Sequence, residues 1–262
     1  MWMSAHGVKP PEEQRRRSGR WYVSVMVERQ SDYLGDPRFF LTFPTPSNPL
    51  GALLSPIDDH HWYLSVNGRD GEEPPSTAEQ VLTHLERLDE QGIHEAVKGT
   101  SGFGELHRFH RVVARWRRYD RLVRPLAGLL PMGDAVSALD PLFGQGMSLA
   151  SWQAVLLRDH LLEVRDVTSN WRVDFTERFH REVAMVVGAA WGLDEDMDRH
   201  FMDESGGFSM ARIRAFADLL ATDPVLHRQY VSMWHLLEPA SLLDDEGLTR
   251  RWDERVQANG DL

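Results

Sequence analysis

The chain has 262 residues, of which 42% are hydrophobic and nine are tryptophan. This length and composition suffice to bury a sizeable core, in one large domain or two smaller ones. The formal net charge of -11 disfavours general binding to nucleic acids, whose phosphates are also negative. The chain contains no cysteine, which excludes disulfides, thiolate metal sites and cysteine nucleophiles.

The N-terminal region, residues 1–17, has no apolar segment of the kind found in secretory signals. It carries the basic cluster Arg15 to Arg17, with Arg20 close by, which we expect to be a solvated flank. The longest run without charge, residues 141–157, is too short and too polar to span a membrane. We therefore expect a cytoplasmic protein without a membrane span.

Alternating apolar and polar residues predict four β-strands before residue 75. Turn signals separate them at Gly35-Asp36-Pro37, at residues 44–49 and at Asp58-Asp59, and two more follow at Asn67-Gly68 and Asp70-Gly71. Short connections between consecutive strands favour an antiparallel meander. The four predicted strands are Trp21–Val27, Phe39–Phe43, Leu50–Leu54 and Trp62–Val66.

After Pro74-Pro75 the pattern becomes helical, and Ser76 or Thr77 can cap a helix that Gly92 ends or interrupts. The apolar run Leu129–Met132 predicts a strand that ends at Gly133. Further helices are predicted over residues 147–162, 171–187, 210–220, 224–237 and 248–256.

A segment rich in arginine precedes the apolar run. Its side chains form either a solvated, salt-bridged face or a set of partners for a pyrophosphate or for the carboxylates of another domain. These arginines are Arg108, Arg111, Arg115, Arg117 and Arg118.

Three glycines, Gly133, Gly144 and Gly146, lie near Asp134 and Pro141 just before a predicted helix. Glycines allow the backbone to approach a ligand closely. The first N–H groups of the helix and its dipole favour an anionic or electron-rich group. Asp134 can accept hydrogen bonds from ribose or ribityl hydroxyls, and Pro141 offers a rigid apolar face. The alternative is a structural strand-turn-helix junction that binds no ligand.

The order Gly133-Asp134-Ala135, Pro141 and Gly144-Gln145-Gly146-Met147 resembles the second flavin-contacting motif of FAD-dependent monooxygenases of the aromatic hydroxylase type. It is closer still to their bacterial epoxidase-like relatives, and the likeness covers about residues 18–165. The resemblance implies FAD as cofactor, NADPH or NADH as reductant, and transfer of oxygen to a substrate. The aromatic-rich strands would suit a small apolar molecule as that substrate. It places Asp134 at the ribityl chain of FAD, Gly133 near the pyrophosphate and Pro141 beside the isoalloxazine. The backbone of Gly144, Gln145, Gly146 and Met147 would then lie at the pyrimidine edge of the ring.

The GxGxxG segment with which this family begins is not found in the sequence, so the chain resembles the C-terminal part of a monooxygenase. Asp140 before Pro141 also resembles geranylgeranyl-reductase-like flavoproteins, whereas the Trp-x-Trp-x-Ile-Pro signature of flavin halogenases is missing. Three functions stay open. They are a flavin-dependent oxygenase, either truncated or completed by a second polypeptide that supplies the Rossmann half; a non-catalytic remnant or binding module; and a flavin-linked reductase.

Together the patterns predict an α+β fold: an antiparallel β-sheet substrate layer, a partial FAD-binding remnant and a helical C-terminal region. The expected parts are a flank over residues 1–17, the sheet with its helix over 18–120, the FAD-contacting strand-loop-helix over 121–165 and the helical region over 166–262. No catalytic residue is identified, and the histidine spacing gives no metal site.

Overall fold

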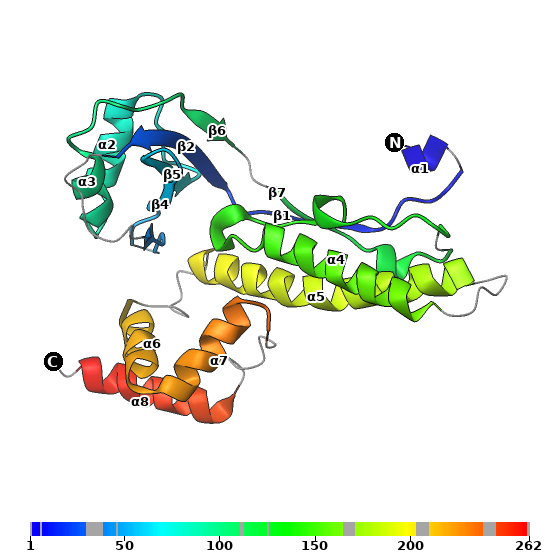
Figure 1. The fold of residues 1–262 in the computed structure, drawn as a ribbon. Helices are drawn as coiled ribbons and strands as arrows, with labels where there is room; N and C mark the ends of the chain where they lie inside the picture. Colours follow the sequence, from blue (N-terminus) through cyan, green and yellow to red (C-terminus); the bar gives the residue numbers. More distant parts are fainter. Residues whose placement is uncertain are drawn as a thin grey trace. The chain divides into compact units, whose positions relative to one another are not determined.

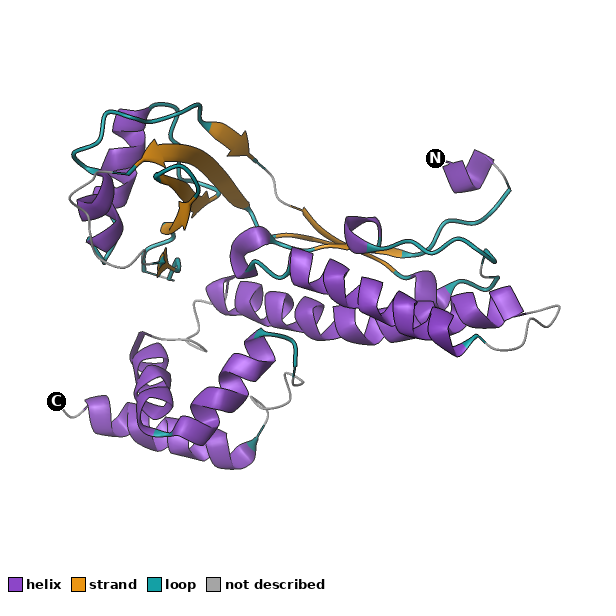
Figure 2. Cartoon of the chain, viewed as in Figure 1, coloured by secondary structure: helices purple, strands orange, loops and turns teal. Residues whose placement is uncertain are grey.

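The computed structural model describes residues 2–5, 7–29, 39–45, 47–110, 113–124, 126–164, 171–202, 210–237 and 245–260. The predicted turn at Gly35-Asp36-Pro37 and the side chain of Arg111 lie outside these residues. Antiparallel sheets and helices confirm the predicted α+β class (Figure 2). The chain divides into two compact units, residues 17–112 and residues 1–16 with 113–262.

The first unit is built on a five-stranded sheet of order β3-β4-β5-β2-β6, in which neighbouring strands are antiparallel (Figure 1). The predicted meander holds for β3, β4 and β5, but β2 pairs with β5 instead of β3. The reason is length, because β2 and β5 match over nine residue pairs whereas β3 has only three residues. The strands are β2 (Arg20–Glu28), β3 (Phe40–Thr42), β4 (Gly51–Ile57), β5 (His61–Arg69) and β6 (His107–Phe109).

The turn predicted at Asn67-Gly68 is wrong, because both residues lie inside β5. Gly68 pairs with Trp21 of β2, and a Cβ atom at Gly68 would lie 2.3 Å from the indole carbon Cζ2. The indole Nε1 of Trp21 also donates to the carbonyls of Arg69 and Glu72, at 3.2 and 3.0 Å. The glycine therefore makes room for a tryptophan in the neighbouring strand.

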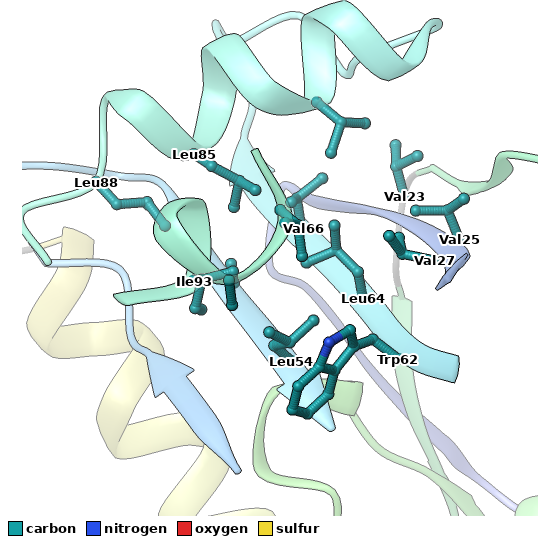
Figure 3. Close-up of a cluster of buried hydrophobic side chains, with 14 of the residues drawn as sticks. Val23, Val25, Val27, Leu54, Trp62, Leu64, Val66, Leu85, Leu88 and Ile93 are labelled. Atoms are coloured by element: carbon teal, nitrogen blue, oxygen red, sulfur yellow. The ribbon is translucent and has the colours of Figure 1, made fainter. Parts of the chain in front are cut away.

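Two helices, α2 (Ala78–Glu86) and α3 (Gly92–Val97), pack on the sheet and complete its core. Thr77 caps α2, since its hydroxyl accepts a hydrogen bond from the Gln80 amide at 3.2 Å. Gly92 begins α3 instead of ending α2, and a Cβ atom there would lie 3.3 Å from the ring of Phe40. Figure 3 shows the core side chains, among them Val23, Val25, Val27, Leu54, Trp62, Leu64, Val66, Leu85, Leu88 and Ile93.

The second unit joins a small sheet of order β1-β7-β8 to two long helices that run side by side (Figure 1). The strand predicted over Leu129–Met132 is wrong, because these residues form no strand and lead into a 3₁₀ turn. Leu130 and Met132 pack against the core, so their apolar pattern reflects burial without a ladder of hydrogen bonds. The elements are β1 (Glu13–Arg17), β7 (Val113–Arg117), η1 (Tyr119–Arg121), η2 (Gly133–Ala135), β8 (Ser137–Ala138), η3 (Pro141–Phe143), α4 (Gly146–Glu163) and α5 (Trp171–Met202).

The prediction that the N-terminal basic cluster is solvated fails at Arg16. Its guanidinium pairs with the buried carboxylate of Asp194 on α5 and lies 4.7 Å from the centroid of the Trp191 ring. Arg20 is buried as well. Arg15, in contrast, is exposed.

Three further helices follow, and each agrees with a predicted one: α6 (Met210–Thr222), α7 (Pro224–Trp234) and α8 (Glu246–Gly260). Asp223 caps α7 by accepting hydrogen bonds from the Val225 and Leu226 amides, both at 3.0 Å. A short helix, α1 (Trp2–Ala5), precedes β1. Within the described part of the chain, no helix combines the length and apolar character that crossing a membrane requires.

We predict that stability falls in acid because of His84. Burial lowers its pKa to about 4, although Nε2 contacts the Gly51 carbonyl at 3.3 Å. Because the folded state disfavours the protonated ring, the stability gained from the neutral ring is complete above the unfolded pKa of about 6.5 and is lost as the pH falls toward 4. Between pH 7 and 4.5 the free energy of unfolding should fall by about 2 kcal/mol more in the wild type than in His84→Leu. Urea unfolding at both pH values measures this, and an equal fall in both proteins would contradict it.

Candidate functional site

The candidate site is the segment from Gly133 to Met147, in which two 3₁₀ turns precede helix α4. The first turn, η2, leads into β8, and the second, η3, starts at Pro141. Asp140 is buried and caps η3, because its Oδ1 accepts a hydrogen bond from the Leu142 amide at 3.1 Å. The segment is thus held in place by short turns and by polar side chains.

Gly133 has a positive φ of 57°, which explains the glycine. Its N–H donates to Oε1 of Gln153 on α4 at 2.8 Å. Gln153 is 1% exposed, and its Nε2 has no hydrogen-bond partner among the described residues. The Gly133 amide is therefore already engaged by the protein, so only other groups of this turn could contact a phosphate.

Asp134 is exposed, and its carboxylate makes no hydrogen bond with the described residues. Its backbone is fixed by Arg117, whose Nη1 donates to the carbonyls of Asp134 and Ala135 at 3.2 and 3.0 Å. Nε of Arg117 donates to Glu13 at 2.9 Å, and the guanidinium groups of Arg15 and Arg117 lower the pKa of Glu13. The turn is held while the acidic side chain faces solvent.

The entrance of α4 offers open space at two glycines. A Cβ atom at Gly144 or Gly146 would meet no heavy atom within 4 Å. Gly144 needs its positive φ of 65°, but Gly146 has no positive φ, so neither conformation nor packing explains it. Met147 is 83% exposed, and the first turn of α4 has neither a side-chain cap nor an acidic residue. The helix dipole there favours an anionic or electron-rich group.

Gln145, the residue before α4, is buried and turned toward α7. Its Nε2 donates to the Trp234 carbonyl at 3.0 Å, and its Oε1 has no hydrogen-bond partner among the described residues. Phe143 of η3 lies 5.3 Å from the Trp234 ring, with the two planes at 39°. The end of α7 thus contacts the residues that begin α4.

The seven predicted site residues therefore lie on one segment that ends in the first turn of α4. Together they offer an exposed carboxylate, an exposed proline and uncapped backbone donors, an arrangement suited to binding and orienting a ligand. Among the described residues, no group of three or more histidines, aspartates or glutamates could hold a metal ion. Sequence reasoning missed Gln153 and Trp234. The available signal for Gln153 was a polar residue within an apolar stretch of the helix, residues 152–157.

We predict that Gln153→Leu makes the η2 turn less stable and its backbone more mobile. Removing the acceptor leaves the Gly133 N–H unpaired, which should cost about 1 kcal/mol in the free energy of unfolding and speed hydrogen exchange at Gly133 by about tenfold. Residue-resolved exchange by NMR and urea unfolding measure the two effects. Ser151→Ala, an exposed change on the same helix, is the control. An unchanged exchange rate at Gly133 would show that the bond does not hold the turn.

The comparisons with known proteins agree with this architecture. No protein-family model matches the chain. Protein Rv3254 of Mycobacterium tuberculosis is 27% identical over 251 residues, which make up 91% of this chain and 51% of that protein. The chain thus spans about half the length of this relative.

Two solved structures show the shared fold. The flavin-dependent brominase Bmp2 is similar with a TM-score of 0.62 at 12% identity, over 97% of this chain and 61% of the brominase. The second, 2-methyl-3-hydroxypyridine-5-carboxylic acid oxygenase, has a TM-score of 0.51 at 16% identity, over 76% of this chain and 51% of the oxygenase. The chain therefore has the fold of part of the flavin-dependent oxygenases and halogenases.

Proposed function

We propose that this chain forms the flavin-facing part of an FAD-dependent oxidoreductase, a monooxygenase or epoxidase-like enzyme that acts on a small apolar molecule. The observation that carries the proposal is Gly146 at the uncapped entrance of α4, where neither the backbone conformation nor the packing requires a missing side chain. A glycine at such a place leaves room for a flat ring against the backbone. The fold shared with a flavin-dependent brominase supports the same conclusion.

The other site residues fit a flavin at this place. The exposed Asp134 can accept hydrogen bonds from ribityl hydroxyls. Pro141 is exposed and presents a rigid apolar face, and the α4 entrance favours the electron-rich pyrimidine edge. Gly133 is the exception, because its N–H is donated to Gln153, and its part would be to shape the turn.

The roles of this chain's own residues are binding and orientation. A bound flavin would supply the redox chemistry, with NADPH or NADH as reductant and dioxygen as the oxygen source. The α4 dipole and the first-turn N–H groups would stabilise negative charge at the ring edge. Asp134 would fix the ribityl chain, while the exposed Pro141 and Met147 would exclude water from the ring. We assign no acid or base to the reaction.

The same proposal includes a partner that supplies the Rossmann half, either a second polypeptide or a further segment. It is supported by the exposed side chains of Met147, Val155, Leu161 and Leu162 on α4, at 83, 43, 52 and 74%. At about 100° per residue these four positions fall within an arc of about 120°, so they share one side of the helix. Apolar side chains exposed on one side of a helix are available for contact with another protein surface.

A non-catalytic binding module is the second candidate. It is favoured by the η2 turn, where Gln153 accepts the Gly133 N–H and Arg117 donates to two backbone carbonyls, so that these backbone groups are already engaged. A flavin-linked reductase differs from a monooxygenase in its product, because only the monooxygenase adds an oxygen atom. Mass spectrometry of the product therefore separates these two.

We predict that FAD, FMN and riboflavin bind this chain with dissociation constants within about tenfold of one another, because the site described contacts the ring and ribityl chain, which all three share. Titration with quenching of flavin fluorescence measures the three constants. If none of the flavins shows saturable quenching, the proposed function is wrong for this chain, and the binding-module alternative gains. If FAD binds more than about a hundredfold better than riboflavin, the chain holds an ADP site elsewhere.

We also predict that Gly146→Leu weakens flavin binding without lowering the stability of the fold. Leucine is the better helix former by about 0.5 to 1 kcal/mol and has open space at this position, so the melting temperature should stay equal or rise. Flavin affinity should fall by about tenfold or more, since the new side chain fills the space kept for the ring. Gly192→Leu on α5, where a Cβ atom also meets nothing within 4 Å, is the matched control. Unchanged flavin affinity in Gly146→Leu would remove the main support for the site.

A further inference from the structure

Trp234, the last residue of α7, contacts the candidate site twice. Its ring lies 5.3 Å from the ring of Phe143, the residue that ends η3. Its carbonyl accepts the hydrogen bond of Gln145 at 3.0 Å. The two contacts use different parts of Trp234, the side chain and the backbone, so they fix both its orientation and its distance from the loop.

A series of neighbouring aromatic rings in the core of the C-terminal helices packs against Trp234. Tyr230 lies 6.1 Å from Trp234 and 5.2 Å from Phe216 of α6, in both cases edge to face. Phe216 lies 4.6 Å from Trp252 of α8. Burial raises the pKa of Tyr230, as expected for a phenol in this core. Because tilted and edge-to-face rings restrict one another, three helices together set the position of Trp234.

The partner of Trp234 on the loop is itself well fixed. Gln145 is buried, and its carbonyl accepts the first intrahelical hydrogen bond of α4 from Leu149 at 3.0 Å. Its side chain therefore links the residue that precedes α4 to the end of α7. A shift of Gln145 would move the first N–H groups of α4, which are the donors assigned to the flavin.

We propose that Trp234 is a positioning residue that sets the entrance of α4, so that the C-terminal helices serve flavin binding without contacting the flavin. The inference rests on the proposed flavin site. It gives a function to α6, α7 and α8, and it predicts that changes at Trp234 alter binding even where the fold is kept.

The experiment compares Trp234→Ala, Trp234→Phe and Gln145→Glu with a control, Leu248→Ala. Leu248 is buried in the same helical core. Trp234→Phe keeps an aromatic ring beside Phe143, whereas Gln145→Glu keeps the size of the side chain but loses the donor. Flavin affinity is measured by titration, and hydrogen exchange of the Leu149 amide, which donates to the Gln145 carbonyl, is measured without flavin.

We expect Trp234→Ala and Gln145→Glu to weaken flavin binding by about tenfold and to speed exchange at Leu149 by a similar factor. Trp234→Phe should retain affinity within about threefold. Leu248→Ala removes no ring of the aromatic series, so it should lower the melting temperature while changing both readouts by less than about threefold. Equal losses in Leu248→Ala and Trp234→Ala would overturn the proposal, because any loss of packing would then suffice. If the wild type binds no flavin, the proposed function fails, but the exchange rates still decide the role of Trp234. Should Trp234→Ala not fold, Trp234→Phe and Gln145→Glu provide the same comparison.

Discussion

The hydrogen bond from the Gly133 amide to Gln153 is the interaction on which the candidate site depends. It ties the turn before β8 to the middle of α4, across 20 residues of sequence. Residues 129–132 form no strand. The path of the loop is therefore set by buried side chains instead of by hydrogen bonds between strands. Asp140 does the same for the second turn, by capping η3. The loop therefore keeps a defined path while Gly144 and Gly146 face open space.

Much of the fold follows from local patterns in the sequence. The alternation in Trp21–Val27 and Trp62–Val66 predicts strands that the structure confirms, and the helical periodicity after Gly146 predicts five helices that are all present. The pairing of β2 with β5 does not follow, because the choice of partner depends on the relative lengths of strands that are distant in sequence. The apolar run at Leu129–Met132 led to a wrong strand prediction, because a segment that packs against the core without forming a strand has the same apolar pattern.

The candidate site, like the fold, could be predicted from the sequence only in part. The spacing of Gly133, Asp134 and Gly146 predicts a loop that enters a helix, and the structure contains one. The partners that hold this loop, Gln153 and Trp234, could not be found by spacing, because they come from other turns of helix and contact the loop only in three dimensions. Arg16 shows that a charge pattern alone does not establish exposure. The basic run predicts solvated side chains, but Arg16 contacts Asp194 and Trp191 on α5. The residue types of the site could thus be read from the sequence, while the way the site is supported became visible only in the structure.

The contact between Trp21 and Gly68 has a consequence for how the sheet can evolve. The indole occupies the space that any side chain at position 68 would need. It also donates to the carbonyl of Arg69, the last residue of β5, and to that of Glu72 in the following turn. The two positions therefore share one volume, and a larger residue at position 68 would displace β2 or β5. A relative with such a residue would need a smaller one at position 21, and the carbonyls of residues 69 and 72 would lose the indole donor. Sequence variation at these two sites is thus coupled by shape, independently of what the protein binds.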